Sequence, residues 1–130
     1  MAQRTHVWHR ILIVDDHPAI QEAVKMKLED IEDLYFDTAD NIVEAYNKIL
    51  NDIPELVILD GEMPGGDGGE LVQILKQDIR YNNIKILGYT GSQCEAQQFE
   101  LLKVDKIIIK SSKEDDLVNF QNTVAKLLEN

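Results

Sequence analysis

Five short apolar runs recur along the chain, and longer amphipathic segments separate them from one another. The runs cover residues 11–14, 34–36, 56–59, 84–87 and 104–109. The first, third and fifth are aliphatic or β-branched with little polar alternation, which is typical of strands covered on both faces. The second run lies between Asp33 and Asp37, and these polar neighbours indicate an edge strand.

The segments between the runs carry helix signals. Pro18 stands where the first residue of a helix is expected, and apolar residues follow it at helical spacing. Two segments, 92–95 and 111–114, have the Ser-x-x-Glu pattern of a capping box ahead of the last two helices. Strands that alternate with crossover helices predict an α/β fold, in which a parallel sheet has helices on both faces.

Length and charge exclude several classes of protein. The 130 residues fit one domain, and 44% of them are hydrophobic, which is enough for a core. Lys and Arg total 13 against 24 Asp and Glu, so the net charge of −11 predicts no direct nucleic-acid binding and favours basic partners or cations. A single cysteine, Cys94, excludes an intramolecular disulfide. The polar start and the lack of a long apolar run predict a cytoplasmic protein without a membrane segment.

Polar side chains follow four of the five predicted strands. Asp15 and Asp16 follow the first strand, Asp60 the third, Thr90 the fourth and Lys110 the fifth. Parallel sheets bind ligands at the carboxyl ends of their strands, so these groups are expected to converge there. Three carboxylates together require neutralisation, and oxygen ligands favour a hard ion, Mg²⁺ or Mn²⁺. A phosphoryl group would then bridge the metal and the Lys110 ammonium.

Each of these features alone has a simpler explanation. An acidic pair after a strand often only begins a helix and offsets its dipole, a lone lysine is usually solvated, and Thr90-Gly91 is an ordinary turn. His17, beside the acidic pair, is interpreted as a helix-start residue rather than a metal ligand, and Cys94 as a partly buried residue of a capping turn. The combination favours chemistry, because the strand ends supply the metal site, cation, donor and carboxylate nucleophile of phosphoryl transfer.

These segments resemble the receiver domain of two-component response regulators. The match runs from about Arg10 to the C-terminus, and residues 1–9 are interpreted as an N-terminal arm ahead of a domain over residues 10–130. The order and spacing of the motifs together are highly specific. The sequence Asp-Asp-His-Pro after the first strand is similar to that of NarL/LuxR-type regulators. The matching segments are 11–17, 57–64, Asp67-Gly68, Thr90-Gly91 and Lys110.

The resemblance implies a flavodoxin-like (βα)5 fold with strand order 2-1-3-4-5. It implies that Asp60 is the phosphoacceptor, which receives a phosphoryl group from a histidine kinase or a histidine phosphotransfer protein. Asp15 and Asp16 match the acidic pair that holds Mg²⁺ together with Asp60, and Glu62 stands where a backbone carbonyl is a further ligand. The chain would be a switch that phosphorylates and dephosphorylates itself, without turnover of an external substrate.

The resemblance also implies an output step. Thr90 matches the switch hydroxyl and Lys110 the lysine that pairs with the phosphoryl group. Phosphorylation in this family biases the face formed by the fourth helix, fifth strand and fifth helix, which contacts an output domain or partner protein and, in some members, a second copy. The chain is therefore predicted to be a stand-alone regulator or the receiver of a longer protein.

Four positions depart from the family pattern. Ile107 stands where Tyr or Phe is usual, so either it is a core isoleucine or switching is altered. Ser111 stands where proline usually follows the lysine, which predicts a trans bond and a helix cap. Gly66 replaces a larger residue, and Glu62 adds a charge beside the phosphorylation site. None of these changes removes a catalytic group.

Two other functions stay open at this stage. One is an interaction module of the same fold that works without phosphorylation, which the departures at Ile107 and Ser111 motivate. The other is a phosphatase of the haloacid-dehalogenase kind, because Asp60-Gly61-Glu62 resembles its two-acid motif. That family places its nucleophile after the first strand and needs a cap domain, for which this chain has no room.

Overall fold

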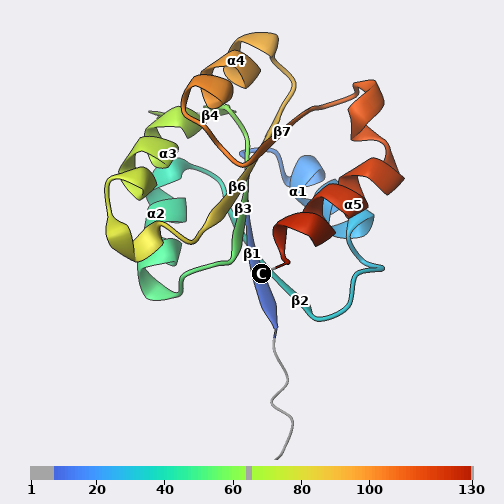
Figure 1. Cartoon of the computed structure of the whole chain (residues 1–130), viewed down its shortest axis with the longest axis horizontal. Coiled ribbons are helices and arrows are strands. Elements are labelled where there is room, and N and C mark those ends of the chain that lie inside the picture. Colours follow the sequence, from blue (N-terminus) through green and yellow to red (C-terminus); the bar gives the residue numbers. More distant parts are fainter. Residues whose placement is uncertain (1–7, 64–65, 130) are drawn as a thin grey trace, which may run out of the picture.

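A parallel sheet runs through the centre of the computed structural model, which describes residues 8–63 and 66–129 (Figure 1). Its strands are β1 (His9–Val14), β2 (Leu34–Ala39), β3 (Leu56–Leu59), β6 (Lys85–Thr90) and β7 (Lys106–Ile109). They lie in the order β2-β1-β3-β6-β7. Counted within this sheet alone, that is the predicted order 2-1-3-4-5, and it confirms the doubly wound fold.

A small hairpin, which the sequence analysis did not predict, lies directly after the third strand of the sheet. It consists of β4 (Glu62–Met63) and β5 (Gly66–Asp67), which pair antiparallel. Each strand has only two residues, too few for an apolar pattern to be seen in the sequence. The predicted loop residue Pro64 lies outside the described residues.

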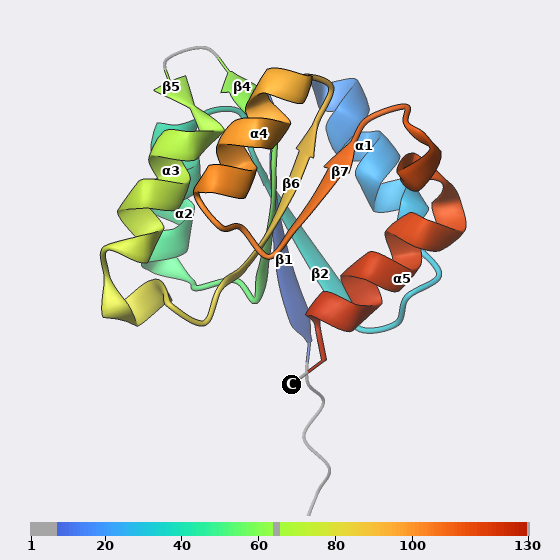
Figure 2. The same cartoon turned by 45° about the horizontal axis from the view of Figure 1, so that its top comes forward.

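Helices cover both faces of the sheet, as the turned view makes clear (Figure 2). Within the described residues, the α-helices are α1 (Pro18–Lys27), α2 (Ile42–Asn51), α3 (Gly68–Lys76), α4 (Gln93–Leu101) and α5 (Leu117–Leu127). Two short 3-10 helices, η1 (Ile79–Tyr81) and η2 (Lys113–Asp115), lie between them. Helices α1 and α5 pack on one face, and α2, α3 and α4 pack on the other. In the described part of the chain, none of them is both long and apolar enough to cross a membrane.

The sheet separates two apolar cores. Val24 and Phe120 are buried under α1 and α5, and Leu71 and Phe99 are buried under α3 and α4. All four residues of β3 are buried, as expected of a central strand, and β2 is the predicted edge strand. Helix α4 packs closely on β6. A Cβ at Gly88 would lie only 2.5 Å from the Phe99 ring, so the glycine leaves room for this ring. This packing positions α4 relative to Thr90, the last residue of β6.

Helix α4 begins as the capping-box pattern predicts. The Ser92 side chain accepts hydrogen bonds from the backbone N–H groups of Cys94 and Glu95. The predicted partial burial of Cys94 is wrong, since its side chain is exposed. The reason is that Ala96 and Phe99 form the buried side of this helix.

The start of α5 differs from the prediction. Ser111 does not cap a helix: its φ of 63° is left-handed, whereas an N-cap residue is extended. Ser112 caps only the 3-10 helix η2, and the Asp116 carboxylate caps α5 by accepting from the backbone N–H of Asn119. The peptide bond before Ser111 is trans, as predicted. The Ser-x-x-Glu pattern therefore marks the start of η2, and α5 begins later, at the cap that Asp116 provides.

Strand β1 begins at His9, which the sequence analysis assigned to the N-terminal arm. The backbone N–H of His9 donates to the Asp33 carbonyl at 2.8 Å, and its ring Nδ1 lies 3.0 Å from the Glu55 carboxylate. These contacts extend the strand by two residues, His9 and Arg10, beyond the apolar run. Residues 1–7 of the arm lie outside the described residues.

Asp37→Asn is expected to destabilise the fold by about 1 kcal/mol at neutral pH. The Asp37 carboxylate accepts from Lys48 at 3.0 Å, Arg10 at 3.1 Å and the Thr38 N–H at 2.9 Å. Burial alone raises the pKa of Asp37, but these partners outweigh it and the pKa lies below its usual value.

Because the pKa of Asp37 is lowered in the folded protein, the stabilisation that it provides depends on pH in a definite direction. The stabilisation by Asp37 is complete above the unfolded pKa of about 4 and is lost as the pH falls through the lower folded value. Urea denaturation at neutral and acidic pH would measure it. A difference between wild type and variant that persists in strong acid would contradict the assignment.

Candidate functional site

The polar groups predicted from the strand ends meet in one open cleft of about 600 Å³ at the carboxyl edge of the sheet. Asp15 and Asp16 follow β1, Asp60 follows β3, Thr90 ends β6 and Lys110 follows β7. This convergence is a consequence of parallel topology, which brings every strand end to the same edge. The cleft is lined by Asp16, His17, Asp60, Glu62, Met63, Thr90, Gly91, Ser92 and Lys110.

Lys110 is the central cation of the site. Its Nζ donates to Asp15 Oδ2 at 2.9 Å and lies 3.6 Å from Asp60 Oδ1. Asp15 is only 2% exposed, so loss of Lys110 would leave this buried carboxylate with His17 as its remaining ion-pair partner, which is costly. The lysine therefore holds the two carboxylates together from one side.

Asp60 is buried at the base of the cleft, and its exposed fraction is 7%. Its backbone N–H donates to the Val14 carbonyl at 2.9 Å, which fixes it relative to β1. Burial raises the pKa of the Asp60 carboxyl above its usual value, and Asp15 adds to this, although Lys110 opposes it. A glycine is required at position 68, because a Cβ there would lie 2.3 Å from the Asp60 carbonyl oxygen.

Asp60→Asn is expected to stabilise the metal-free protein at neutral pH by about 1 kcal/mol. The raised folded pKa means that the charged form of Asp60 disfavours the fold. This cost develops as the pH rises above the unfolded pKa of about 4, and it is complete above the folded pKa. The advantage of the variant should disappear in acid, where Asp60 is protonated in both states. Thermal unfolding in a chelator at several pH values measures it, and a less stable variant at neutral pH would contradict it.

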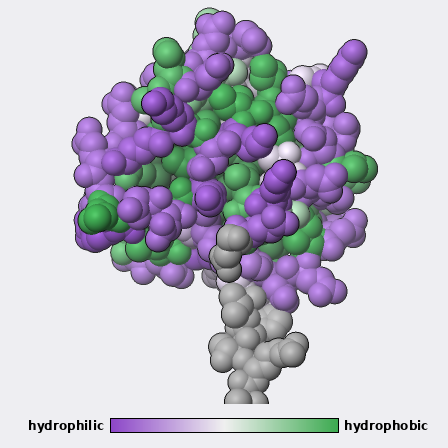
Figure 3. All heavy atoms as spheres, viewed as in Figure 1, coloured by the Kyte–Doolittle hydropathy of each residue, from purple (hydrophilic) through white to green (hydrophobic). Residues whose placement is uncertain are grey.

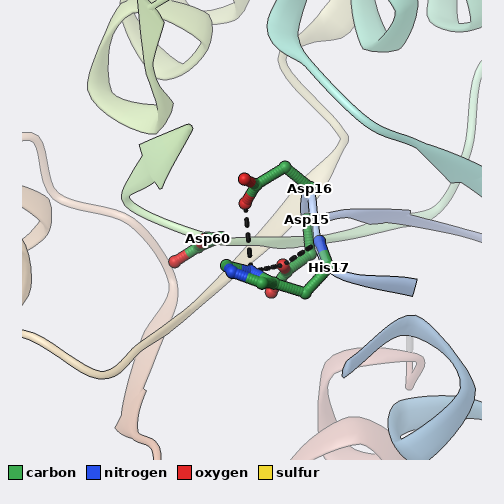
Figure 4. Close-up of side chains that lie close together, drawn as sticks. All are labelled: Asp15, Asp16, His17 and Asp60. Atoms are coloured by element: carbon green, nitrogen blue, oxygen red, sulfur yellow. Dashed lines mark hydrogen bonds and ion pairs between the residues drawn. The ribbon is translucent and has the colours of Figure 1, made fainter. Parts of the chain in front are cut away.

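Asp16 and His17 both line the cleft, and dashed lines in Figure 4 join the His17 ring to the Asp15 and Asp16 carboxylates. The His17 Nδ1 is 3.0 Å from Asp15 Oδ1 and 3.1 Å from Asp16 Oδ1. A hydrogen bond to Asp15, followed by the charges of Asp16 and Asp15, raises the pKa of the His17 ring. The contact with Asp16 lacks hydrogen-bond geometry, so the buried Asp16 Oδ1 has no hydrogen-bond partner.

This donor set fits a hard divalent cation. One ligand atom from each of Asp15, Asp16, His17 and Asp60 lies within 4.8 Å of the others. The buried Asp16 Oδ1, which has no hydrogen-bond partner, is the feature that a cation would satisfy. The three carboxylates are the ligands that Mg²⁺ and Mn²⁺ prefer. The predicted role of His17 as a helix-start residue agrees with its position as N-cap of α1.

Of the remaining predicted site residues, Thr90 and Glu62 line the cleft, whereas Ile107 is not part of its lining. Thr90 is buried, and its Oγ1 accepts from the Ser92 N–H at 3.3 Å. Glu62 is an exposed residue of β4, and the role predicted for its backbone carbonyl stays a prediction. Ile107 packs partly buried against the α2–α4 core and faces a groove of about 220 Å³ between α4 and β7. Figure 3 shows apolar surface in this region, bordered by hydrophilic side chains.

The sequence analysis missed the position of Glu95. Its side chain lies on Gly61, where a Cβ would be 2.4 Å from Glu95 Cγ, and its buried Oε2 has no hydrogen-bond partner. The pattern showed Glu95 only as part of a capping box, because nothing in the sequence reports how α4 leans over the loop after Asp60. Tyr89, which precedes Thr90 on β6, is buried and packs on Phe120.

Comparison with known proteins decides the family. The family model of the response regulator receiver domain matches residues 11–121. This chain belongs to the response regulator receiver family. Within it, the chain is 35% identical to the oxygen regulatory protein NreC of Staphylococcus epidermidis over 118 residues, which are 88% of this chain and 54% of that protein. This similarity agrees with the predicted resemblance to NarL/LuxR-type regulators.

Other receiver-containing proteins give the same assignment. The chain is 36% identical to response regulator Rre1 of Synechocystis sp. over 93 residues, 68% of this chain and 40% of that protein. It therefore spans about half the length of the curated relatives that it matches. Among solved structures, response regulator TrrA of Thermotoga maritima, in complex with Mg²⁺-BeF, is 35% identical with a TM-score of 0.77, covering 92% of this chain and 99% of that one.

Proposed function

We propose that this receiver domain is a phosphorylation switch in which Asp60 accepts a phosphoryl group. The observation that carries the proposal is the contact of a buried Asp60 with Lys110, beside an acidic pair in which a buried Asp16 oxygen has no hydrogen-bond partner. The strand ends together supply a carboxylate nucleophile, a cation and the acidic groups that a metal would need. The family assignment supports the same conclusion.

The reaction is an in-line transfer to a carboxylate oxygen of Asp60. The new P–O bond forms as the P–N bond of a phosphohistidine donor breaks, and the leaving imidazole nitrogen takes up a proton. Burial disfavours the charged carboxylate of Asp60, while Lys110 favours the charged form, which is the nucleophile in this transfer. The transfer converts the Asp60 side chain into an acylphosphate, which is the form that the switch must recognise.

Asp15, Asp16 and Asp60 would hold Mg²⁺ or Mn²⁺, with the Glu62 backbone carbonyl as a further ligand. Such an ion, when bound, neutralises charge that develops on the phosphoryl oxygens. The relative TrrA was solved with Mg²⁺-BeF, which supports this assignment. The Lys110 Nζ lies 3.6 Å from Asp60 Oδ1 and is proposed to contact another phosphoryl oxygen.

The Thr90 hydroxyl is proposed to complete the site. It now accepts only from the Ser92 N–H, at 3.3 Å, so its own proton is available to a phosphoryl oxygen. Movement of Thr90 would be transmitted to the face formed by α4, β7 and α5. Ile107 on this face lines a groove and provides no aromatic ring, and the choice between a core isoleucine and altered switching stays a prediction.

The partners follow from this role. The donor is proposed to be a sensor histidine kinase or a histidine phosphotransfer protein, and the receiver acts through an output domain or a partner protein on the α4-β7-α5 face. Phosphorylation-linked dimerisation and a cytoplasmic location stay predictions. We expect no turnover of an external substrate.

Incubation with acetyl phosphate and Mg²⁺, followed by intact-mass measurement, tests the proposal. We expect an increase of one phosphoryl group that requires both the metal and Asp60, so Asp60→Asn and chelator-treated samples should show none. Asp30→Asn changes an exposed carboxylate and serves as the matched control, with normal phosphorylation. A folded wild type that gains no mass would favour an interaction module that works without phosphorylation.

A further inference from the structure

Three polar side chains outside the cleft form a closed network on the α1/α5 side of the sheet. Lys27 of α1 donates to the Tyr89 hydroxyl at 2.9 Å and to Asp115 Oδ1 at 2.6 Å. The Tyr89 hydroxyl in turn donates to Asp115 Oδ1 at 2.8 Å. Phe120 closes the network on one side, since the Lys27 Nζ lies 4.9 Å from the centre of its ring. No step of the proposed phosphoryl transfer uses these residues.

The network is well shielded from solvent, which makes its partners depend on one another. The side chains of Lys27 and Asp115 are 23% and 8% exposed. Burial raises the pKa of Asp115, but its bonds to Lys27, the Ser111 N–H and Tyr89 outweigh this and leave the pKa below its usual value. Loss of one partner therefore leaves the others with unpaired buried groups.

The network is connected directly to the loop that carries Lys110. The backbone N–H of Ser111 donates to Asp115 Oδ2 at 2.8 Å, and Ser111 has the left-handed φ of 63°. The backbone N–H of Lys110 donates to the Thr90 carbonyl at 2.8 Å. The Lys110 Nζ also lies 5.4 Å from the centre of the Tyr89 ring. The backbone of Lys110 and Ser111 is thus held by hydrogen bonds to Thr90 and Asp115, and the Lys110 side chain lies over the Tyr89 ring.

We propose that Asp115, Tyr89 and Lys27 are positioning residues for Lys110. Asp115 fixes the backbone immediately after the lysine in a conformation that a serine rarely adopts unaided, and the Tyr89 ring guides the ammonium toward Asp15 and Asp60. Lys27 holds both Asp115 and Tyr89 in place. The inference rests on the proposed role of Lys110 in phosphoryl transfer, and it assigns to α1 a part in shaping the site.

Two variants remove the positioning contacts without touching the cleft. Asp115→Ala removes the bond to Ser111, and Asp115→Asn keeps the shape and an acceptor but removes the charge that Lys27 requires. We expect Asp115→Ala to lower the rate of phosphorylation by acetyl phosphate ~tenfold, because a displaced catalytic cation loses most of its effect. The Asp115→Asn variant should lie between this and wild type. The affinity for Mg²⁺ should stay unchanged in both.

Asp37→Ala is the matched control. Like Asp115, Asp37 accepts from a lysine, a backbone N–H and one further side chain, but none of these partners belongs to the cleft. Rates are compared below the unfolding transition of every variant. We expect Asp37→Ala to be destabilised and yet phosphorylated at the wild-type rate. An equal loss of rate in Asp37→Ala would overturn the inference, because general loosening would then explain it.

A second readout is independent of phosphorylation. The side chain of Lys110 is 17% exposed, so its acylation by a succinimidyl ester, followed by peptide mass spectrometry, reports how firmly it is held. We expect Lys110 to react several-fold faster in Asp115→Ala than in wild type or Asp37→Ala. Unchanged labelling in the folded variant overturns the inference. If wild type itself accepts no phosphate, the proposed function fails, and the labelling alone decides the positioning role.

Discussion

Lys110→Met is expected to slow phosphorylation of Asp60 by acetyl phosphate ~100-fold, the scale found when one charge-stabilising group is removed from a transfer site. Methionine keeps much of the length and the apolar stem of lysine but has no charge. The Lys110 Nζ is 3.6 Å from Asp60 Oδ1 and is the cation placed to meet the incoming phosphoryl group. The rate of mass increase at saturating Mg²⁺ measures the effect.

The same change also affects stability, so the two readouts need separate controls. Loss of the 2.9 Å contact leaves Asp15 buried without its lysine partner, and we expect a lower melting temperature. Lys106→Met changes an exposed lysine of the adjacent strand β7 and should keep the wild-type rate. A folded Lys110→Met variant that is phosphorylated at the wild-type rate would remove Lys110 from the proposed mechanism.

Asp16→Asn is expected to abolish the stabilisation of the protein by Mg²⁺. A ligand that binds only the folded state stabilises it by about 2.7 kcal/mol at a hundred times its dissociation constant. The Asp16 Oδ1 is buried and has no hydrogen-bond partner, so it depends on a cation more than the other carboxylates do. Thermal unfolding with and without MgCl2, together with calorimetric titration of the metal, measures the loss.

The metal-free forms provide an internal check on this prediction. Without Mg²⁺, Asp16→Asn should be at least as stable as wild type, because one charge of the acidic cluster is removed. Asp78→Asn alters a carboxylate that pairs with Arg80 near α3, outside the cleft, and should keep the full response to Mg²⁺. An Asp16→Asn variant that responds to the metal as wild type does would show that the ion binds elsewhere.

The sequence by itself determined the fold and the membership of the cleft. Apolar runs at two different periods specify a parallel sheet, and a parallel sheet brings the carboxyl ends of all its strands to one edge. The residues after those runs, such as Asp60 and Lys110, could therefore be assigned to one site without knowledge of any contact. Where a pattern was short or ambiguous it failed, as with the two-residue strands β4 and β5 and the cap assigned to Ser111.

Only the tertiary structure decided how that site is held together. Lys27, Tyr89 and Asp115 are separated by 62 and 26 positions in the chain, and no local pattern relates them. Their contacts depend on how α1 and α5 pack on the sheet, which side-chain shape and burial decide rather than periodicity. The same holds for the burial of Asp15 beside Lys110, because a carboxylate in the sequence carries no sign of how much water it will keep.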